Sequence, residues 1–376
     1  MARAPDSVYR RRRLVAVLAL AFVALAIVIL VVGIGGDGSE PQPAGDPYAD
    51  VALDRLVGQR LMVRMHDEAT PELLDAARAG TIGGVILFPP PDAAPAAIAD
   101  QVARLQQAAT AGANPPLLVA IDQEGGEVKR LPAGPPQRSP SQLGAVGDAA
   151  ASSAEGEATA SFLTQFGVNT DLAPVLDVAG PGSFVSGRAF SDDPGVVAEV
   201  GVAFAEGLQK GGVAATAKHF PGLGLASVNT DFAASVVAAP RSDVRAGIEP
   251  FEAAVAAGVD LVMVGTATYT ALDPDAPAAL SERVVGRELR DRIGFDGVVI
   301  TDDLEAGSIT ATRTAEDAAV DAARAGTDIL LFAKRAGPGP IAAALARAAR
   351  RGGLDRASLE AAYGRIVALK DAVAAG

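Results

Sequence analysis

The stretch "GVVITDD", residues 297–303, decides the fold. Uncharged, mostly β-branched side chains follow a glycine, and two aspartates come directly after them. A short run that is continuously apolar is typical of a strand buried on both faces, as in a parallel sheet. Polar residues directly after such a strand are costly unless they are paired or used, so Asp302 and Asp303 are candidates for a functional site.

Seven further runs of the same kind occur from residue 48 onward: 61–65, 84–88, 117–121, 172–178, 213–217, 261–265 and 329–332. Alanine-rich amphipathic segments separate them, and several of these end in glycine, as helices commonly do. Eight strand–helix units over about 290 residues predict an α/β fold, a closed (β/α)₈ barrel of the TIM type. An open doubly wound sheet is the alternative. The last helical segments, 339–351 and 355–375, are expected to pack outside the barrel.

The composition excludes several classes of function. The chain of 376 residues is 49% hydrophobic and 20% charged, which favours a filled core over disorder. It has no cysteine and two histidines, so disulfides, thiol nucleophiles and Cys- or His-rich metal sites are excluded. The net charge is −13, and residues 1–34 carry +4 from five arginines and one aspartate, which leaves −17 on the remainder. Nucleic acid is therefore not an expected partner.

The N-terminus is predicted to be a membrane anchor. Arg10–Arg13 precede the uncharged stretch Leu14–Ile34, which as a helix is about 31 Å long and spans a bilayer core. No convincing small-x-small cleavage site follows, although a signal peptide is the alternative. The predicted organisation is a cytoplasmic basic tail (1–13), a transmembrane helix (14–34), a linker (35–47) and a barrel domain (48–376). The arginines predict a single-pass protein of the cell membrane with the barrel on the extracytoplasmic side.

In such a barrel the chemistry is located at the carboxyl ends of the strands. The residues at these ends are Arg64, His66, Asp122, Asp177, Lys218, His219, Thr266, Asp302 and Asp303. Asp302 is the best candidate for a nucleophile, because retaining glycosidases use a carboxylate to attack the anomeric carbon of a sugar. The simpler interpretation is that Asp302 or Asp303 caps the following helix, with Asp303 the better cap. His66 is interpreted as a structural residue.

Five side chains have the right chemistry to bind sugar hydroxyls: Asp122, Glu124, Arg188, Lys218 and His219. The alternative is that they form a buried ion-pair network that braces the barrel rim. The glycine pair in "QEGGE", residues 123–127, admits close backbone approach, which is a weak signal alone.

Several motifs together resemble glycoside hydrolase family 3, and most closely its single-domain β-N-acetylglucosaminidase (β-hexosaminidase) branch. They occur in the family's order: "IDQEGGEVKRL" (121–131), "GVNTDLAPVLDV" (167–178), "GRAFSDDP" (187–194), "KHFPGLG" (218–224), "YTALDPDAPAALS" (269–281) and "GFDGVVITDDL" (294–304). The resemblance covers about residues 52–372, nearly the whole extracytoplasmic part.

The resemblance implies a (β/α)₈ barrel and a retaining glycosidase. It implies that Asp302 is the nucleophile and that four side chains bind the terminal sugar: Asp122, Arg188, Lys218 and His219. The expected substrate carries terminal β-linked sugars, N-acetylglucosamine of cell-wall glycans such as peptidoglycan. No metal or organic cofactor is implied, and the protein is expected to be a monomer.

The sequence departs from this branch in one loop, "KHFPGLGLASVNTD", residues 218–231. The branch has His-Gly and then Asp-Ser-His, whose last histidine is the proton donor oriented by the aspartate. Here Leu223 replaces the first histidine, and Asn229, Thr230 and Asp231 replace Asp-Ser-His. A further family histidine, after the sixth strand, is Thr266 here.

Three explanations are open. Asp231 can itself be the acid/base, because most glycosidases pair two carboxyl groups and a neighbouring nucleophile raises the pKa of the second one. Alternatively, the domain is a catalytically impaired protein that binds cell-wall sugars. A third explanation is a slow enzyme that acts only on substrates with good leaving groups, since general acid catalysis typically contributes about 10²–10⁴-fold.

Overall fold

The computed structural model describes residues 47–180, 182–334 and 337–375. Residues Asp50–Gly376 form one compact unit. In the part of the chain that is described, no helix is both long and apolar enough to cross a membrane. The predicted basic tail and anchor, residues 1–34, and nearly all of the predicted linker, 35–47, lie outside the described residues.

Eight parallel strands form the main sheet: β1 (Leu61–Met65), β2 (Gly84–Leu87), β3 (Leu118–Ile121), β6 (Thr170–Asp171), β7 (Ala214–Phe220), β9 (Leu261–Val264), β11 (Val298–Thr301) and β12 (Leu330–Phe332). Neighbours in the sheet follow chain order, and β12 pairs with β1. A bridge between Ile300 and Ile329 joins β11 to the start of β12 and closes the ring. The predicted barrel is confirmed, and the doubly wound alternative is wrong.

The predicted fourth strand is misplaced. The structure has β6 at Thr170–Asp171, whereas the apolar run 172–178 leaves the regular ladder and keeps one bridge, between Val175 and Lys218. Pro174 lies inside this run and has no N–H to donate to a neighbouring strand. The apolar run therefore marks the residues just beyond the strand.

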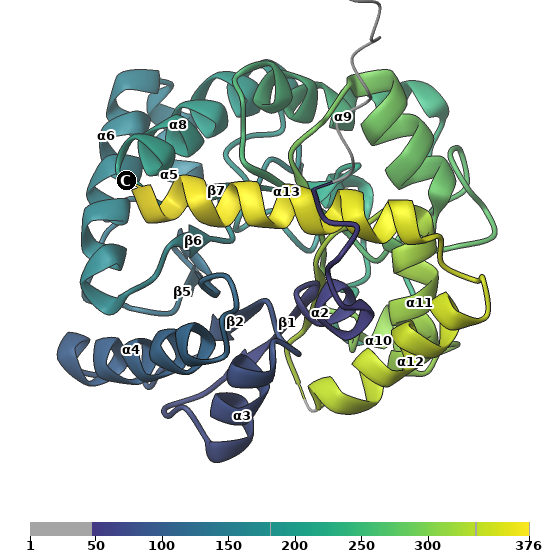
Figure 1. Ribbon diagram of the computed structural model, residues 1–376. Coiled ribbons are helices and arrows are strands. Elements are labelled where there is room, and N and C mark those ends of the chain that lie inside the picture. Colours follow the sequence, from purple (N-terminus) through teal and green to yellow (C-terminus); the bar gives the residue numbers. More distant parts are fainter. Residues whose placement is uncertain (1–46, 181, 335–336, 376) are drawn as a thin grey trace, which may run out of the picture. The chain divides into compact units, whose positions relative to one another are not determined.

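Helices connect the strands and surround the barrel (Figure 1). The α-helices are α2 (Leu53–Gly58), α3 (Pro71–Ala79), α4 (Pro95–Ala111), α5 (Pro140–Val146), α6 (Ala149–Leu163), α7 (Pro194–Val196), α8 (Val202–Lys210), α9 (Arg241–Ala256), α10 (Gly307–Thr310), α11 (Ala315–Ala325), α12 (Pro338–Arg350) and α13 (Arg356–Ala375). The helix η5 (Arg283–Ile293) is a π-helix. Two small strand pairs lie outside the barrel sheet: β4 (Gln123–Gly125) and β5 (Val128–Lys129) form an antiparallel hairpin, and β8 (Val236–Val237) pairs in parallel with β10 (Thr268–Tyr269).

Local signals in the sequence mark the ends of some of these helices. The side chain of Thr314 accepts the N–H of Asp317 at the start of α11, and the helix ends at Gly326 with φ +99°. Thr70 and Gly80 do the same for α3, with Pro71 in its first turn. Such signals make the helix bounds readable from sequence.

The barrel interior is filled by side chains from alternate positions of the strands, such as Met62, Leu118, Leu261 and Ile300. The intervening residues, Val63 among them, face the surrounding helices. Helix α13 contributes Ile366 and Leu369 to the interior cluster and lies across one end of the barrel (Figure 1). The last helix therefore lies outside the ring of strands, as the sequence predicted, but its apolar side chains cover one end of the barrel, opposite the polar strand ends.

Candidate active site

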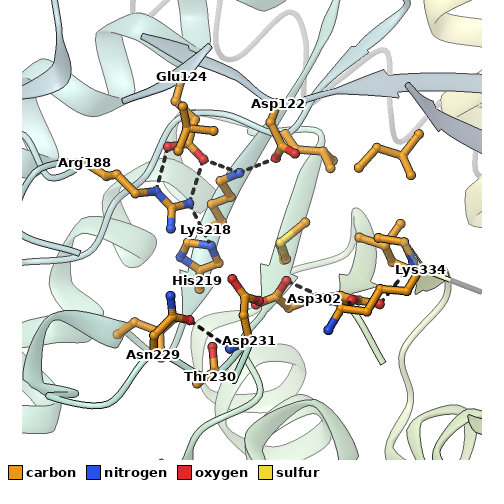
Figure 2. A pocket seen from close by; sticks show the side chains of 18 of the residues that line it. Asp122, Glu124, Arg188, Lys218, His219, Asn229, Thr230, Asp231, Asp302 and Lys334 are labelled. Atoms are coloured by element: carbon orange, nitrogen blue, oxygen red, sulfur yellow. Dashed lines mark hydrogen bonds and ion pairs between the residues drawn. The ribbon is translucent and has the colours of Figure 1, made fainter. Parts of the chain in front are cut away.

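A cavity of about 420 Å³ lies at the carboxyl ends of the barrel strands. The six residues that the sequence predicted as catalytic or sugar-binding line it: Asp122, Arg188, Lys218, His219, Asp231 and Asp302. They lie in β7 or in the segments that follow β3, β6, β7 and β11 (Figure 2). Residues that are up to 180 positions apart in the sequence thus surround one space.

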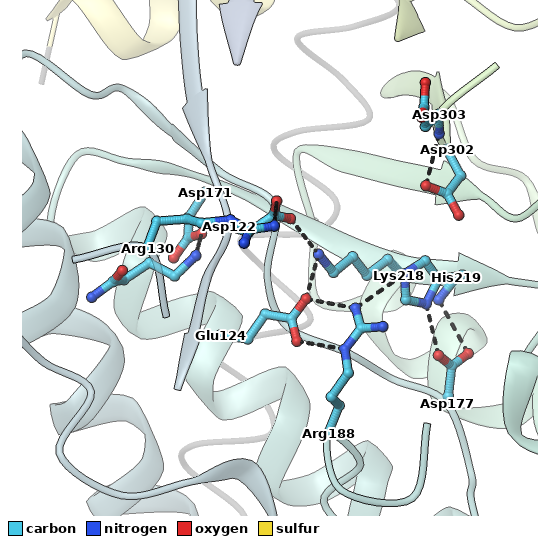
Figure 3. Close-up of polar contacts among 11 residues, drawn as sticks. Asp122, Glu124, Arg130, Asp171, Asp177, Arg188, Lys218, His219, Asp302 and Asp303 are labelled. Carbon is cyan, nitrogen blue, oxygen red and sulfur yellow. Dashed lines mark hydrogen bonds and ion pairs between the residues drawn. The ribbon is translucent and has the colours of Figure 1, made fainter. Parts of the chain in front are cut away.

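One wall of the cavity is an ion-pair network centred on Lys218 and Glu124 (Figure 3). The Nζ of Lys218 lies 2.9 Å from Asp122 Oδ1 and 2.6 Å from Glu124 Oε1. Arg188 binds Glu124 with two bonds, of 2.9 Å from Nε and 2.7 Å from Nη2. The ion-pair network that was the alternative interpretation is present, and its members also face the cavity.

Electrostatics keep this wall ionised. Burial alone would raise the pKa of Asp122, but the positive charges of Lys218 and Arg130 outweigh it and lower the pKa to about 2. Burial would likewise raise the pKa of Glu124, but the positive charges of Lys218 and Arg188 outweigh this effect and lower the pKa. Burial would lower the pKa of Lys218, yet the two carboxylates raise it. The wall therefore presents fixed donors and acceptors at neutral pH.

Asp177 holds His219 in place. Its Oδ2 lies 2.8 Å from His219 Nδ1, and its Oδ1 accepts the backbone N–H groups of His219 at 3.1 Å and Leu223 at 2.7 Å. A carboxylate only accepts, so Nδ1 carries a proton and donates. The other ring nitrogen, Nε2, lies 3.4 Å from Arg188 Nη2. Asp177 is fully buried and acts on the cavity through His219.

Asp302 and Asp303 are neighbours with different surroundings. Asp302 lines the cavity, and its Oδ1 accepts the N–H of Asp303 at 2.7 Å. Asp303 is 7% exposed and accepts the N–H groups of Glu305 at 3.0 Å and Ala333 at 3.1 Å. Burial raises the pKa of Asp303 to about 6. Asp303 thus holds the turn after β11 and leaves Asp302 for the cavity, whereas the simpler interpretation expected a cap on the following helix; α10 begins after Ala306 without a side-chain cap.

The loop that carries Asp231 is fastened beside Asp302. The carbonyl groups of Thr230 and Asp231 accept the N–H groups of Ser308 and Gly307, each at 3.0 Å, at the start of α10. The side chain of Asn229 accepts the N–H of Asp231 at 2.8 Å. Figure 2 shows the carboxyl groups of Asp231 and Asp302 directed into the same part of the cavity. Asn229 therefore shapes the turn that presents Asp231.

The electrostatic state of Asp231 follows from this position. Partial desolvation by the cavity walls, and then the negative charge of Asp302, raise the pKa of its carboxyl group. The residue remains accessible at the cavity rim, so solvent moderates the shift. A carboxyl group whose pKa is raised beside a second carboxyl group is the arrangement that glycosidases use for a proton donor.

Arg130 is a cavity residue that the sequence interpretation missed. Its Nη2 lies 3.3 Å from Asp122 Oδ2. The β4–β5 hairpin turns at Gly125 and Gly126, which have φ values of +95° and +60°, and so returns the chain to Asp122 eight residues later. The glycine pair was the available signal, and its function is this turn.

Asp171 at the end of β6 was also missed. It is fully buried, and its Oδ1 accepts the N–H of Gln123 at 3.0 Å. Burial raises its pKa to about 8, so it is neutral at pH 7. Its position at the end of a misplaced strand explains why the sequence did not reveal it.

Three other positions discussed from the sequence do not contribute a polar group to the cavity. His66 is exposed and lies outside the cavity lining. Thr266 is buried, and its Oγ1 accepts a hydrogen bond of 2.9 Å from Ser308. Leu223 is buried and lines the cavity with an apolar surface. In contrast, Phe232 lines the rim while 82% exposed, as an aromatic face suited to stacking on a sugar ring.

Paired carboxyl groups and fixed hydrogen-bonding groups make the cavity suited to sugar chemistry. Among the described residues, no group of three or more histidine, aspartate or glutamate side chains is arranged to hold a metal ion. The chemistry available from the described side chains is nucleophilic attack by a carboxylate and proton transfer by a carboxyl group.

Comparisons with known proteins agree with this description. The model of the glycosyl hydrolase family 3 N-terminal domain matches residues 52–369. A β-hexosaminidase of Xanthomonas oryzae is 37% identical over 220 residues, which cover 56% of this chain and 66% of that protein.

Solved structures are similar over most of the chain. A family 3 β-N-acetylglucosaminidase from Paenibacillus superposes with a TM-score of 0.83 at 35% identity, over 86% of this chain and 63% of that one. A β-N-acetylhexosaminidase from Beutenbergia cavernae superposes with a TM-score of 0.80 at 36% identity, over 86% of this chain and 99% of that one. This chain thus spans slightly less than two thirds of the Paenibacillus protein and nearly all of the Beutenbergia protein. The chain belongs to glycoside hydrolase family 3 and is a β-hexosaminidase-like glycosidase of that family.

Proposed function

We propose that this protein is a retaining glycoside hydrolase that removes terminal β-linked N-acetylglucosamine, with Asp302 as nucleophile and Asp231 as acid/base. The observation that carries the proposal is the position of these two carboxyl groups in one cavity, where partial burial and then the charge of Asp302 raise the pKa of Asp231. The similarity to proteins named β-hexosaminidase and β-N-acetylglucosaminidase supports the choice of sugar.

In the first step, the Asp302 carboxylate attacks the anomeric carbon while the bond from that carbon to the glycosidic oxygen breaks. The protonated Asp231 gives its proton to that oxygen, so that the leaving sugar departs as a neutral alcohol. In the second step, the Asp231 carboxylate takes a proton from water, whose oxygen attacks the anomeric carbon and releases Asp302. Asp231 is protonated again at the end, and the anomeric configuration is retained.

The ion-pair wall supplies binding. The Lys218 and Arg188 side chains donate to sugar hydroxyl oxygens, and Asp122 accepts from hydroxyl hydrogens. Asp177 fixes the His219 ring so that Nε2 faces Arg188. These groups are held by one another before a ligand arrives, so little ordering is needed when the sugar binds.

The test uses the full-length chain, an aryl N-acetyl-β-glucosaminide with a good leaving group, and an unactivated β-linked disaccharide. We expect both substrates to be hydrolysed, with β-configured product detected first by NMR. Azide is expected to restore activity of Asp231→Asn on the aryl substrate by replacing the water of the second step. If the wild type hydrolyses neither substrate yet binds N-acetylglucosamine oligomers, the protein is a sugar-binding protein and the hydrolase proposal is wrong.

We also propose that residues 14–34 anchor the protein in the cell membrane with the barrel outside, where cell-wall glycans are the accessible substrate. The apolar length of this stretch and the arginines before it support the proposal. The protein is then expected in the membrane fraction, with a barrel that is cleaved by protease added to intact protoplasts. A soluble extracellular chain that starts near Gly35 would contradict it.

A further inference from the structure

Two arginines share one aromatic ring at the side of the cavity formed by β1, β2 and β3. The guanidinium carbon of Arg64 lies 4.2 Å from the centre of the Phe88 ring, and that of Arg130 lies 4.9 Å from it. All three residues line the cavity. Cation–π contact with the ring orients both guanidinium groups, but it does not neutralise them.

Arg64 has no carboxylate partner among the residues that the structure describes. Its Nη1 donates to the Ala333 carbonyl at 3.2 Å, and its Nε is buried without a hydrogen-bond partner in that part of the chain. Arg130 is bound to Asp122, but its own Nε is likewise buried and unpaired there. Buried donors without a partner are costly, so both guanidinium groups are incompletely satisfied by the described part of the chain.

The carboxylates near Arg64 are engaged by other groups. Burial and the nearby Arg130 lower the pKa of Arg64, while Asp303 opposes this change. Asp303 is itself occupied by backbone N–H groups and by Lys334, whose Nζ lies 3.6 Å away. Asp122 is shared between Arg130 and Lys218. A guanidinium remains protonated in a protein, so Arg64 stays a cation at the cavity wall that forms no ion pair with the residues that the structure describes.

We propose that Arg64, together with Arg130, forms a subsite for an anionic substituent on the sugar that occupies the cavity: a carboxylate, a phosphate or a sulfate. This inference rests on the proposed sugar-binding function of the cavity. Arginine presents planar, paired donors that match the oxygens of these groups, and stacking on Phe88 holds the donors in position. Asp231 and Asp302 line the same cavity, so an anion is attracted to the arginines and repelled by the carboxyl groups. The subsite thereby selects both the substituent and its orientation.

The experiment measures binding by calorimetry to the full-length wild type, which needs no turnover. The probes are N-acetylglucosamine, its 6-phosphate, its 6-sulfate, and N-acetylmuramic acid, which carries a carboxylate on O3. We expect at least one anionic probe to bind about tenfold or more tightly than the neutral sugar, as one charge-assisted contact provides. The probe that gains affinity identifies the group and its place on the ring.

Arg64→Met should bring the ratio of anionic to neutral affinity close to one, because the preference for the anionic probe is lost. Arg64→Lys should keep part of that preference. Arg104→Met is the matched control, because Arg104 is exposed on α4 and bonded to Gln101, away from the cavity. This control should keep the wild-type ratio. If Arg64→Met does not fold, the wild-type ratio must still fall between low and high salt.

Neutral and anionic probes of equal affinity, or a ratio that survives Arg64→Met, would overturn the subsite. The outcomes that overturn the subsite can be distinguished from those that overturn the proposed hydrolase activity. An anionic preference without any hydrolysis leaves the subsite in place and removes the catalytic proposal. Hydrolysis without a preference for the anionic probe leaves the catalytic proposal in place and removes the subsite.

Discussion

The carboxylate of Asp177 accepts two hydrogen bonds from His219: Oδ2 lies 2.8 Å from the ring Nδ1, and Oδ1 lies 3.1 Å from the backbone nitrogen. Asp177→Asn keeps the oxygen for the backbone but replaces the other with an amide that cannot accept from Nδ1–H. The Nδ1–H tautomer of the His219 ring is then no longer fixed by a hydrogen bond. We expect the affinity for N-acetylglucosamine to fall about tenfold, as measured by calorimetry. Unchanged affinity in a folded variant would show that Asp177 has no effect on the site.

Asp302→Asn is expected to remove nearly all hydrolysis while the melting temperature stays close to that of the wild type. The amide oxygen of asparagine can still accept the N–H of Asp303. A 2-deoxy-2-fluoro glycosyl probe should label Asp302, as mass spectrometry of peptides will detect. Labelling of another residue contradicts the assignment.

Asp303→Ala, at the neighbour of Asp302, is expected to affect stability. It leaves the N–H groups of Glu305 and Ala333 without their acceptor, so we expect a loss of about 1–3 kcal/mol in the free energy of unfolding. Urea unfolding measures this loss. A variant as stable as the wild type would show that Asp303 is not the cap of this turn.

Asp171 should make the protein less stable as pH rises. Its folded pKa is raised to about 8 from an ordinary value of 3.8, so between these values the unfolded state loses a proton that the folded state keeps. Stability then falls by about 1.4 kcal/mol per pH unit at most, from about pH 4 to about pH 8. Asp171→Asn removes this dependence, and its melting temperature should exceed that of the wild type increasingly from pH 4 to pH 7. A constant difference between the two proteins contradicts the prediction.

The barrel was predictable because its strands are short apolar runs and several of its helices, such as α3 and α11, carry an N-terminal cap and a terminal glycine. The fourth strand was not, because β6 is made of Thr170 and Asp171, which show no apolar pattern, whereas the apolar run beside it contains Pro174. The position of α13 across the barrel end also depends on packing that no local pattern reports.

The cavity was predictable where polar residues follow an apolar run directly: Asp122 and Asp302 come just after β3 and β11, and Lys218 follows the run 213–217 although the structure extends β7 to Phe220. Arg130 reaches the cavity through a hairpin, and Arg64 had no evident role until its contact with Phe88 was known. The use of Asp177 to orient His219 likewise needs the fold, since 42 residues separate the two.

The pH dependence of activity should reflect a carboxyl donor. The raised pKa of Asp231 means that the acid is present below that pKa and is lost as pH rises through it. Activity should therefore decline on the alkaline side at a lower pH than with a histidine donor. The double variant Asn229→Asp with Asp231→His, which rebuilds the family's loop, should move this decline to higher pH. An unchanged profile in an active double variant would show that residue 231 does not set it.

The most direct test of the account is the ratio of kcat/KM between Asp231→Asn and the wild type on two substrates. An unactivated disaccharide needs the acid to break its bond, so we expect a loss on the order of 10²–10⁴-fold. An aryl glycoside with a good leaving group does not need it, so its first step should change less than about tenfold. A loss of the same size on both substrates, or no loss on either, would contradict Asp231 as the proton donor.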